Sequence, residues 1–358
     1  MDILVCNTKF RPLAIIDAYE SFIWTDRYDK YGDFELYMTI SGEFPDYIKQ
    51  DYYLINNESE HVMIIEKIEI KTDPEEGTHV TITGRSLESI LDRRIVWGRK
   101  SIDGSLQNGI KTLLTENIIS PSNSTRRIGN FIFEASTDSA ITGLTIDAQY
   151  TGDNLYDVIT KICSERGIGF KITLNDSNQF VFKLYSGVDR SYNQTTYPYV
   201  VFSPNFDNIL NSNYIESKSA LKNITLVAGE GEGSERKFET VGDTSVAGLN
   251  RRELFTDARD ISSDLGDGRV LSASEYSAKL NQRGNEKLSE NAEVSSFEGE
   301  AETTTMFRYG EHFFMGDIVQ VANEYGHETP ARVIELVQSV DVEGTTTYPT
   351  FKSIEKGA

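Results

Sequence analysis

The chain has 358 residues, of which 38% are hydrophobic and 11% aromatic, so it has enough apolar material to build folded domains. Lysine and arginine number 35 and aspartate and glutamate 56, giving a formal net charge of −21, which disfavours binding to nucleic acid or an anionic membrane. The start lacks signal-peptide features, no apolar run is long enough to span a membrane, and the two cysteines suit a protein made in the cytoplasm.

Alternation of apolar and polar residues predicts a β-rich first region. Phe34, Leu36 and Met38 alternate with polar residues, which is the pattern of a half-buried strand. Two further strands follow and are joined by a hairpin loop at residues 73–77. Ser86 is the expected N-cap of a short helix after this hairpin.

The middle of the chain combines helices and strands. Residues 103–117 and 154–166 each carry an apolar stripe and predict two helices, the second of which ends at Gly167. Residues 170–174 and 180–185 predict a hairpin. This region therefore has the character of a separate α+β domain.

Strands return after about residue 208, and Ser272 with Glu275 forms a capping box that opens a helix ending near residue 291. The predicted organisation has three parts. They are a first β domain (1–98), an inserted α+β domain (99–215), and a second β domain (216–358) with a helical insert at about 259–292.

Two stretches about 260 residues apart share five short motifs in the same order. The first contains residues 23–26, Phe34 with Glu35, Asp51, residues 64–66 and Gly77; the second contains residues 254–257, Phe297 with Glu298, Asp317, residues 333–335 and Gly344. We interpret them as two copies of one β unit, in which Asp51 matches Asp317 and Glu66 matches Glu335. The alternative is chance similarity between two β-rich segments. A duplicated unit is typical of symmetric rings.

No catalytic, cofactor or metal motif is found in the sequence. The four histidines lack metal-ligand spacing, and there is no CxxC or HExxH pattern. The glycine-rich run at 229–233 lacks the Lys-Ser/Thr ending of a phosphate loop, and its two carboxylates would repel phosphate. We therefore predict that the protein is not an enzyme and needs no cofactor.

Acidic residues alternate along several predicted strands. Glu298, Glu300 and Glu302 are spaced so that they share one strand face, and the same spacing relates Glu230 to Glu232 and Asp33 to Glu35. Like charges aligned on one face of a strand are destabilising unless that face is exposed to solvent. One interpretation is a solvated sheet face; the other is the acidic wall of a channel through which DNA slides without sticking.

Several short motifs are distributed along essentially the whole chain. They are residues 24–28, 31–36, 84–87, 91–96, 186–191, 198–203, 207–208, 227–233 and 282–284. Together they resemble the siphophage tail-hub family of Tal-like proteins, which close the tip of a long non-contractile tail. These motifs mark membership of the family rather than a catalytic mechanism.

The resemblance implies an α+β, mainly β fold, similar to the baseplate hub of contractile-tailed phages, with two tube-type β-barrel domains and an inserted α+β domain. It further implies a homotrimeric, pseudo-sixfold ring that closes the tail tube at the virion tail tip, after assembly in the host cytoplasm. The expected neighbours are a distal tail protein, a tape measure protein and tip or fibre proteins, with DNA passing through without specific binding. The alternative function is a receptor- or carbohydrate-binding tail protein.

Overall fold

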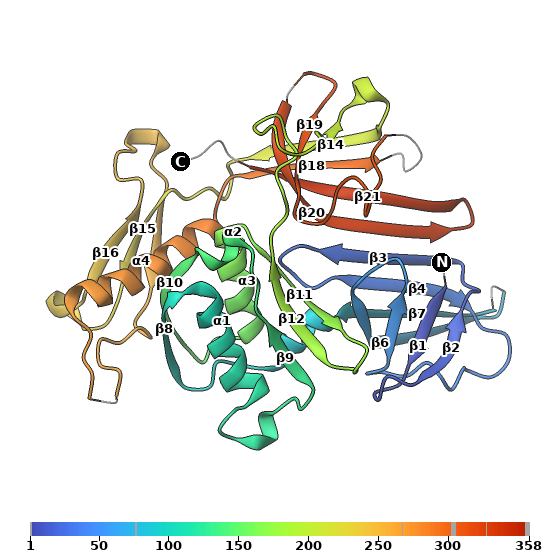
Figure 1. Ribbon diagram of the computed structural model, residues 1–358, viewed down its shortest axis with the longest axis horizontal. Coiled ribbons are helices and arrows are strands. Elements are labelled where there is room, and N and C mark those ends of the chain that lie inside the picture. Colours follow the sequence, from blue (N-terminus) through green and yellow to red (C-terminus); the bar gives the residue numbers. More distant parts are fainter. Residues whose placement is uncertain (1, 76, 267, 302–305, 327, 355–358) are drawn as a thin grey trace. The chain divides into compact units, whose positions relative to one another are not determined.

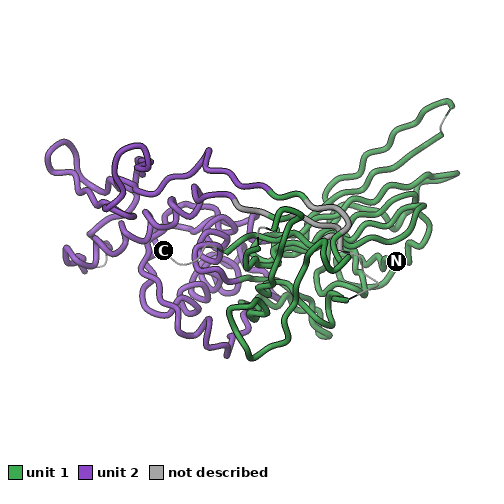
Figure 2. Tube along the Cα trace, turned by 90° about the horizontal axis from the view of Figure 1, so that it is seen from above, with its two compact units in different colours: residues 1–89, 169–214, 296–358 green, residues 90–168, 215–295 purple. Residues whose placement is uncertain are grey.

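A computed structural model of the chain describes residues 2–75, 77–266, 268–301, 306–326 and 328–354. The chain folds into two compact units, each assembled from separate segments (Figure 2). Unit 1 comprises residues 1–89, 169–214 and 296–358, and unit 2 comprises residues 90–168 and 215–295. The division into three consecutive parts predicted from the sequence is a different division of the chain, and it stays a prediction.

Unit 1 consists mainly of strands, and unit 2 combines strands with the longer helices. The short helix η1 (Leu87–Arg93) runs from unit 1 into unit 2. The elements assigned mainly to unit 1 are β1 (Ile3–Cys6), β2 (Pro12–Ile16), β3 (Ser21–Arg27), β4 (Asp33–Thr39), β5 (Tyr53–Asn56), β6 (Val62–Asp73), β7 (Gly77–Ser86), β11 (Gly169–Leu174), β12 (Phe180–Tyr185), β13 (Val201–Phe202), η4 (Pro204–Phe206), β14 (Ile209–Ser217), β18 (Val294–Ala301), β19 (Ile318–Ala322), β20 (Glu328–Asp341) and β21 (Gly344–Ser353). Those of unit 2 are β8 (Arg99–Ser105), α1 (Leu106–Leu114), η2 (Thr115–Ile119), η3 (Ser124–Arg126), β9 (Phe131–Glu134), α2 (Ser139–Thr142), β10 (Thr145–Thr151), α3 (Leu155–Arg166), β15 (Ile224–Ala228), η5 (Gly233–Glu235), β16 (Phe238–Gly242), η6 (Gly248–Asn250), β17 (Glu253–Asp257) and α4 (Ala273–Glu290).

The large sheet of unit 1 contains the same arrangement of five strands twice. One copy, which we call repeat 1, has the strand order β3-β4-β7-β6-β5, and the other, repeat 2, has the order β14-β18-β21-β20-β19. Each repeat continues onto a further short strand, because β1 pairs with β5 and β13 pairs with β19. The mainly β fold and the duplication predicted from the sequence are therefore present.

The hairpins β6–β7 and β20–β21 match pair for pair. In both, three residue pairs precede a bulge and seven pairs lead from the bulge to the turn, which closes at Gly77 in repeat 1 and at Gly344 in repeat 2. The unpaired bulge residue is Glu66 in repeat 1 and Ile334 in repeat 2. The predicted match of Glu66 with Glu335 is therefore wrong by one residue, whereas that of Gly77 with Gly344 is correct.

The next strand of each repeat has the register expected from the sequence. Phe34 of β4 pairs with Gly84, and Phe297 of β18 pairs with Phe351. Gly84 and Phe351 belong to the last residue pair before the bulge in their hairpins. Phe34 and Phe297 are thus equivalent, as predicted, and so are the backbone positions of their neighbours Glu35 and Glu298.

Two other predicted matches are wrong. The Asp51 N–H donates to the carbonyl of Ile65, the residue before the bulge in repeat 1. In repeat 2 the residue before the bulge is Val333, and its carbonyl accepts from the N–H of Gly316 rather than of Asp317. Residues 254–257 lie in β17, which pairs with β15 in unit 2 and has no place in the large sheet. The strand that corresponds to β3 is β14. Repeat 2 therefore carries the second segment of unit 2 between β14 and β18, where repeat 1 has only a short turn.

The two repeats are joined edge to edge inside the chain (Figure 1). The first half of β20 pairs with β19, and its second half, Glu335 to Val340, pairs with β3 in antiparallel register. Unit 1 is therefore one sheet whose strand order over the described residues is open, running from β14 to β2.

Each repeat buries its own core. The core of repeat 1 is centred on Phe22, Trp24, Phe34, Leu36 and Ile82. The core of repeat 2 is centred on Phe202, Phe297, Phe313, Val333 and Phe351. These side chains alternate along their strands with more exposed ones, so the pattern of the sequence determines which sheet face is buried.

Unit 2 contains the predicted helices with small changes of boundary. Helix α3 has Asn154 as N-cap and the left-handed Gly167 after its last turn, and α4 begins with the predicted capping box at Ser272. Helix α1 begins only at Leu106, because Asp103 lies in β8 and pairs with β10. Helix α4 packs on the sheet of β15, β16 and β17. None of the described helices combines the length and apolarity needed to cross a bilayer.

Candidate functional site

Arg27 connects the two repeats electrostatically. It lies on β3, forms ion pairs with Asp33 of the following strand and with Glu335 of β20, and donates to the Tyr31 carbonyl at 3.1 Å. Its neighbour Asp26 is buried. Asp26 accepts from the Trp24 indole N–H at 2.9 Å and from the Ser59 hydroxyl at 2.7 Å. This family-like motif therefore organises the join between the repeats.

The Gly84-Arg85-Ser86 motif holds β7 against its neighbours. A Cβ on Gly84 would lie 1.8 Å from the Ile64 carbonyl oxygen, so only glycine fits there. Arg85 forms a two-pronged ion pair with Glu66, with N–O distances of 2.7 and 2.9 Å. The Ser86 hydroxyl accepts the Gly32 N–H at 2.7 Å instead of capping the following helix.

Asp317 is the centre of the motif at residues 186–191. Its buried carboxylate accepts the Val188 N–H at 2.8 Å and the Phe314 N–H at 3.1 Å, and it pairs with Arg190 at 2.7 Å. A Cβ on Gly187 would lie 2.0 Å from the Gly316 carbonyl carbon. The motif therefore fixes the loop after β12 onto the start of β19.

A buried pair of ionisable groups lies in the same unit. His61 Nδ1 and Glu88 Oε1 are 3.1 Å apart, and the same Glu88 oxygen accepts the Ile172 N–H of β11 at 2.7 Å. Burial disfavours the charged imidazole, but the carboxylates of Glu88 and Asp26 raise the pKa of His61 to about 9. Burial opposes ionisation of Glu88 as well, but His61 holds the pKa of Glu88 below its usual range. Sequence reasoning missed this pair, because its members are 27 residues apart and follow no motif.

Several of these side chains line a pocket of about 530 Å³ in unit 1. Its wall includes Asp26, His61, Lys171, Arg190 and Asp317. The charges are mixed and mostly paired with each other, for example Lys171 with Glu60. Among the residues that the structure describes, no three His, Cys, Asp or Glu side chains are grouped as metal ligands. The wall of this pocket is therefore formed largely by ion pairs that connect parts of the fold.

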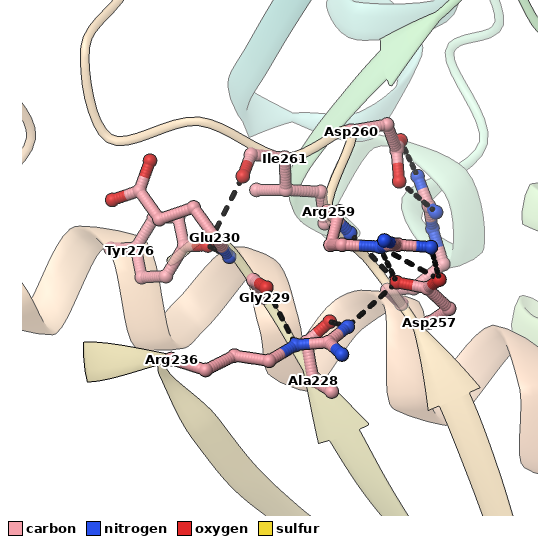
Figure 3. A network of polar contacts seen from close by, with 10 residues as sticks. Ala228, Gly229, Glu230, Arg236, Asp257, Arg259, Asp260, Ile261 and Tyr276 are labelled. Carbon is pink, nitrogen blue, oxygen red and sulfur yellow. Dashed lines mark hydrogen bonds and ion pairs between the residues drawn. The ribbon is translucent and has the colours of Figure 1, made fainter. Parts of the chain in front are cut away.

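The glycine-rich run at 229–233 belongs to a polar network in unit 2 (Figure 3). Arg236 donates to the carbonyls of Ala228 and Gly229, at 3.0 and 3.2 Å, and pairs with Asp257 at 2.8 Å. The Glu230 N–H donates to the Tyr276 hydroxyl at 2.7 Å, and that hydroxyl donates to a loop carbonyl. These contacts attach the ends of β15 and β17 to α4, so the run is a fixed turn rather than a phosphate loop.

The Gln282-Arg283-Gly284 motif lies on α4 and also attaches this helix to its neighbours. Arg283 pairs with Asp260 at 2.9 Å. A Cβ on Gly284 would meet Val241 at 2.7 Å, so glycine allows the helix to approach the sheet. Gln282 donates to Glu165 of α3 at 2.6 Å. Burial raises the pKa of Glu165 to about 7.

The predicted acidic residues lie in different environments. Asp33 is paired with Arg27; Glu35 is exposed on β4, in a row across the sheet with Thr83 and Lys67. Glu230 is half-buried and accepts the Ser263 N–H at 2.9 Å, whereas Glu232 is exposed on the turn. Glu302 lies outside the described residues. For Glu298 and Glu300 only the backbone in β18 is described.

Comparison with known proteins identifies relatives for this fold. Residues 2–351 match the family model of the siphovirus ReqiPepy6 Gp37-like protein. The chain is similar to prophage tail protein gp18 from Listeria monocytogenes EGD-e, at 11% identity over 100% of this chain and 96% of that one, with a TM-score of 0.57. It is also similar to the 43 kDa tail protein of prophage MuSo2 from Shewanella oneidensis (14%, 98% and 98%, TM-score 0.57) and to a tail protein from Neisseria meningitidis MC58 (12%, 98% and 96%, TM-score 0.53). No curated protein matches the sequence.

Proposed function

Because the chain belongs to the siphovirus ReqiPepy6 Gp37-like protein family, whose fold is that of phage tail proteins, we propose that it is the structural hub of the tail tip. In this proposal three copies form a pseudo-sixfold ring that closes the tail tube and opens for DNA. Distal tail, tape measure and tip or fibre proteins are its neighbours. The role is structural rather than enzymatic.

The duplicated sheet is the observation that carries this proposal. One chain supplies two repeats with the same strand order and hairpin register, and it joins them edge to edge through β20 and β3. Three such chains would supply six similar units and could match a sixfold tube on one side and a threefold tip on the other.

The family-like motifs support a structural role. Gly84, Gly187 and Gly284 allow close backbone or helix contacts, and Arg27 and Asp317 anchor strands and loops. Each of these residues is explained by packing or by ion pairs inside the chain. None of these contacts requires a bound substrate, so the motifs support a structural role rather than a catalytic one.

We expect assembled tails to contain three copies of this chain related by a threefold axis. The reason is that two joined repeats per chain give six units only with three chains. Electron cryo-microscopy of purified tails, refined without imposed symmetry, measures this directly. A twofold dimer with an isologous interface, or a ring of six chains, would contradict the proposal.

The position shared by Glu35 and Glu298 is our proposed acidic lining of the channel. In a ring of three chains the two positions give six carboxylates at pseudo-equivalent places. Replacing both with lysine is expected to preserve assembly but to slow DNA ejection by about tenfold at low salt, because lysine attracts phosphate most strongly where screening is weak. Ejection is followed by dye binding to released DNA at several salt concentrations.

A matched control has the same change of charge elsewhere. Glu43 and Asp176 are exposed acids in loops of unit 1. The Glu43→Lys/Asp176→Lys variant is expected to eject DNA at the normal rate. Equal rates for both double variants would remove the argument for a channel lining at Glu35 and Glu298.

A further inference from the structure

Three arginines from two separate segments gather at one place on unit 2. Arg93 is the last residue of η1, Arg94 follows it, and Arg126 is the last residue of η3. Arg94 Nε donates to the Arg126 carbonyl at 3.2 Å, and Arg94 Nη1 donates to the Arg93 carbonyl at 2.9 Å. We call these three residues the arginine cluster. Its contacts hold three positive charges close together.

The charges of the arginine cluster are not neutralised inside the chain. Burial and the positive charges of Arg126 and Arg93 lower the pKa of Arg94. Within the described residues, the guanidinium groups of Arg94 and Arg126 donate to carbonyl oxygens and to Asn117 Oδ1, and no carboxylate pairs with either. A guanidinium has five N–H groups, of which these contacts use two in each arginine. Donors therefore remain for an acceptor outside the chain.

An exposed tryptophan lies against the arginine cluster. Arg126 Cζ is 4.8 Å from the centre of the Trp97 ring, which is a cation–π contact. Asn117 Oδ1 accepts from both residues, from the Trp97 main-chain N–H at 3.0 Å and from Arg126 at 3.1 Å. Arg126 also donates to the Ile95 carbonyl at 2.9 Å. Trp97 is 69% exposed and Ile95 is 41% exposed, so apolar surface is fixed directly beside the positive charges.

The arginine cluster differs from the other arginine sites of this fold. Arg85, Arg190 and Arg283 each pair with a carboxylate of the chain. Asp92 is the acid next to the cluster in the sequence, and its carboxylate accepts the Asn154 amide at 2.9 Å. Acids are abundant in a chain with a net charge of −21. The lack of carboxylate partners for Arg94 and Arg126 is therefore a property of this particular surface.

We propose that the arginine cluster, together with Trp97 and Ile95, is a docking surface for an acidic segment of a neighbouring tail protein. Carboxylates of the segment accept the remaining guanidinium N–H groups, and an apolar residue of the segment packs on Trp97. The planar fork of arginine fits a carboxylate with two parallel hydrogen bonds. Tryptophan and arginine are also the residues that most often dominate the binding energy of protein interfaces. The inference rests on the proposed function only for the presence of neighbouring tail proteins.

The charge of the whole chain favours a short protein segment over an extended polyanion. Duplex DNA or an anionic bilayer extends well beyond three arginines, so it would also meet the acidic surface of a chain at −21. A peptide segment can contact the arginine cluster alone. The exposed indole adds apolar contact area, which a protein side chain can cover and a phosphate cannot.

The test places a photo-crosslinking amino acid at Ile95 in the full chain, in phage tails made by complementation, so that Trp97 and the arginines are retained. Crosslinked peptides are identified by mass spectrometry. We expect a crosslink to a different tail protein, within a segment that contains several Asp or Glu residues. The control is the same amino acid at Leu249, which is fully exposed in η6 of the same unit and is expected not to reach that segment.

A peptide with the crosslinked sequence then tests the role of charge in the purified full chain. Binding is followed by the fluorescence of Trp97, since Trp24 is buried. Arg93→Glu is expected to raise the Kd of the peptide by about tenfold. Lys111→Glu, which reverses another exposed charge of unit 2, is expected to leave the Kd unchanged. Duplex DNA and phosphatidylglycerol vesicles are the other probes, and neither is expected to change the fluorescence.

Several results would overturn the inference. They are a crosslink from position 95 to lipid, to nucleic acid or to a segment without acids, the absence of any crosslink, and an equal Kd for Arg93→Glu and Lys111→Glu. Each of these leaves the proposed function intact, because the number of copies in the tail is measured separately by electron cryo-microscopy. A tail tip without three copies would overturn the proposed function and leave the docking surface in place.

Discussion

Replacing Gly84 with alanine is expected to lower the free energy of unfolding by about 3 kcal/mol or more, the upper range for overpacking. The added Cβ would lie 1.8 Å from the Ile64 carbonyl oxygen and 2.9 Å from a ring carbon of Phe34. Both neighbours belong to strands that pair directly with β7, so neither can move without breaking the sheet. The equivalent residue of repeat 2 is Phe351. The glycine is therefore required by this local contact and not by the repeat in general.

Trp24 offers a direct measurement of this effect. It is buried in unit 1, whereas the second tryptophan, Trp97, is 69% exposed in unit 2. In a Trp97→Phe background, fluorescence during urea unfolding reports the surroundings of Trp24. Gly129→Ala is the control, because a Cβ on exposed Gly129 meets no atom within 4 Å. Equal midpoints for Gly84→Ala and the parent would show that the strands can separate to admit the methyl group.

Local patterns in the sequence predicted the elements well where one residue type decides the structure. Phe34 and Phe297 were matched correctly because alternating strands keep a fixed register from the hairpin outwards. Gly167 and the capping box at Ser272 marked helix ends correctly, whereas Asn154, the predicted first residue of its helix, is the N-cap of a helix that begins one residue later. These signals are local, and tertiary contacts do not override them at these positions. At Ser86, the predicted N-cap of the short helix, a tertiary contact does: its hydroxyl accepts the Gly32 N–H.

The errors have physical causes as well. Each long hairpin contains a bulge, and an alignment by residue type cannot tell which residue is left unpaired, so Glu66 was matched one position too far. Residues 254–257 resemble residues 23–26 because both are β-rich, although they belong to different sheets. The true counterpart of β3 is β14, because β3 pairs with β4 as β14 pairs with β18. This equivalence is one of strand pairing and not of residue types, so it cannot be found by comparing the two sequences.

Removing the imidazole of His61 is expected to lower the free energy of unfolding by about 3–5 kcal/mol, as for other broken buried ion pairs. Glu88 would keep its contact with the Ile172 N–H but would lose the charge that offsets its burial. Urea unfolding of His61→Ala measures this loss. In a double-mutant cycle, adding Glu88→Gln is expected to cost less in the His61→Ala background than in the parent, because the unpaired carboxylate is removed. Strictly additive losses would show that the two side chains do not interact.

The same pair makes stability depend on pH in a defined direction. The pKa of His61 is about 9 in the folded protein and about 6.5 when unfolded, so between these values the folded state holds a proton that the unfolded state releases. The stabilisation is complete below about pH 6.5 and falls by about 3 kcal/mol as the pH rises to 9. Urea midpoints measured from pH 6 to pH 9 should therefore decline in the parent and in His312→Ala, which removes an exposed histidine. The decline should be much smaller in His61→Ala. If His61→Ala shows the same slope as the parent, another group carries the pH dependence, and His61 is neutral in the folded protein.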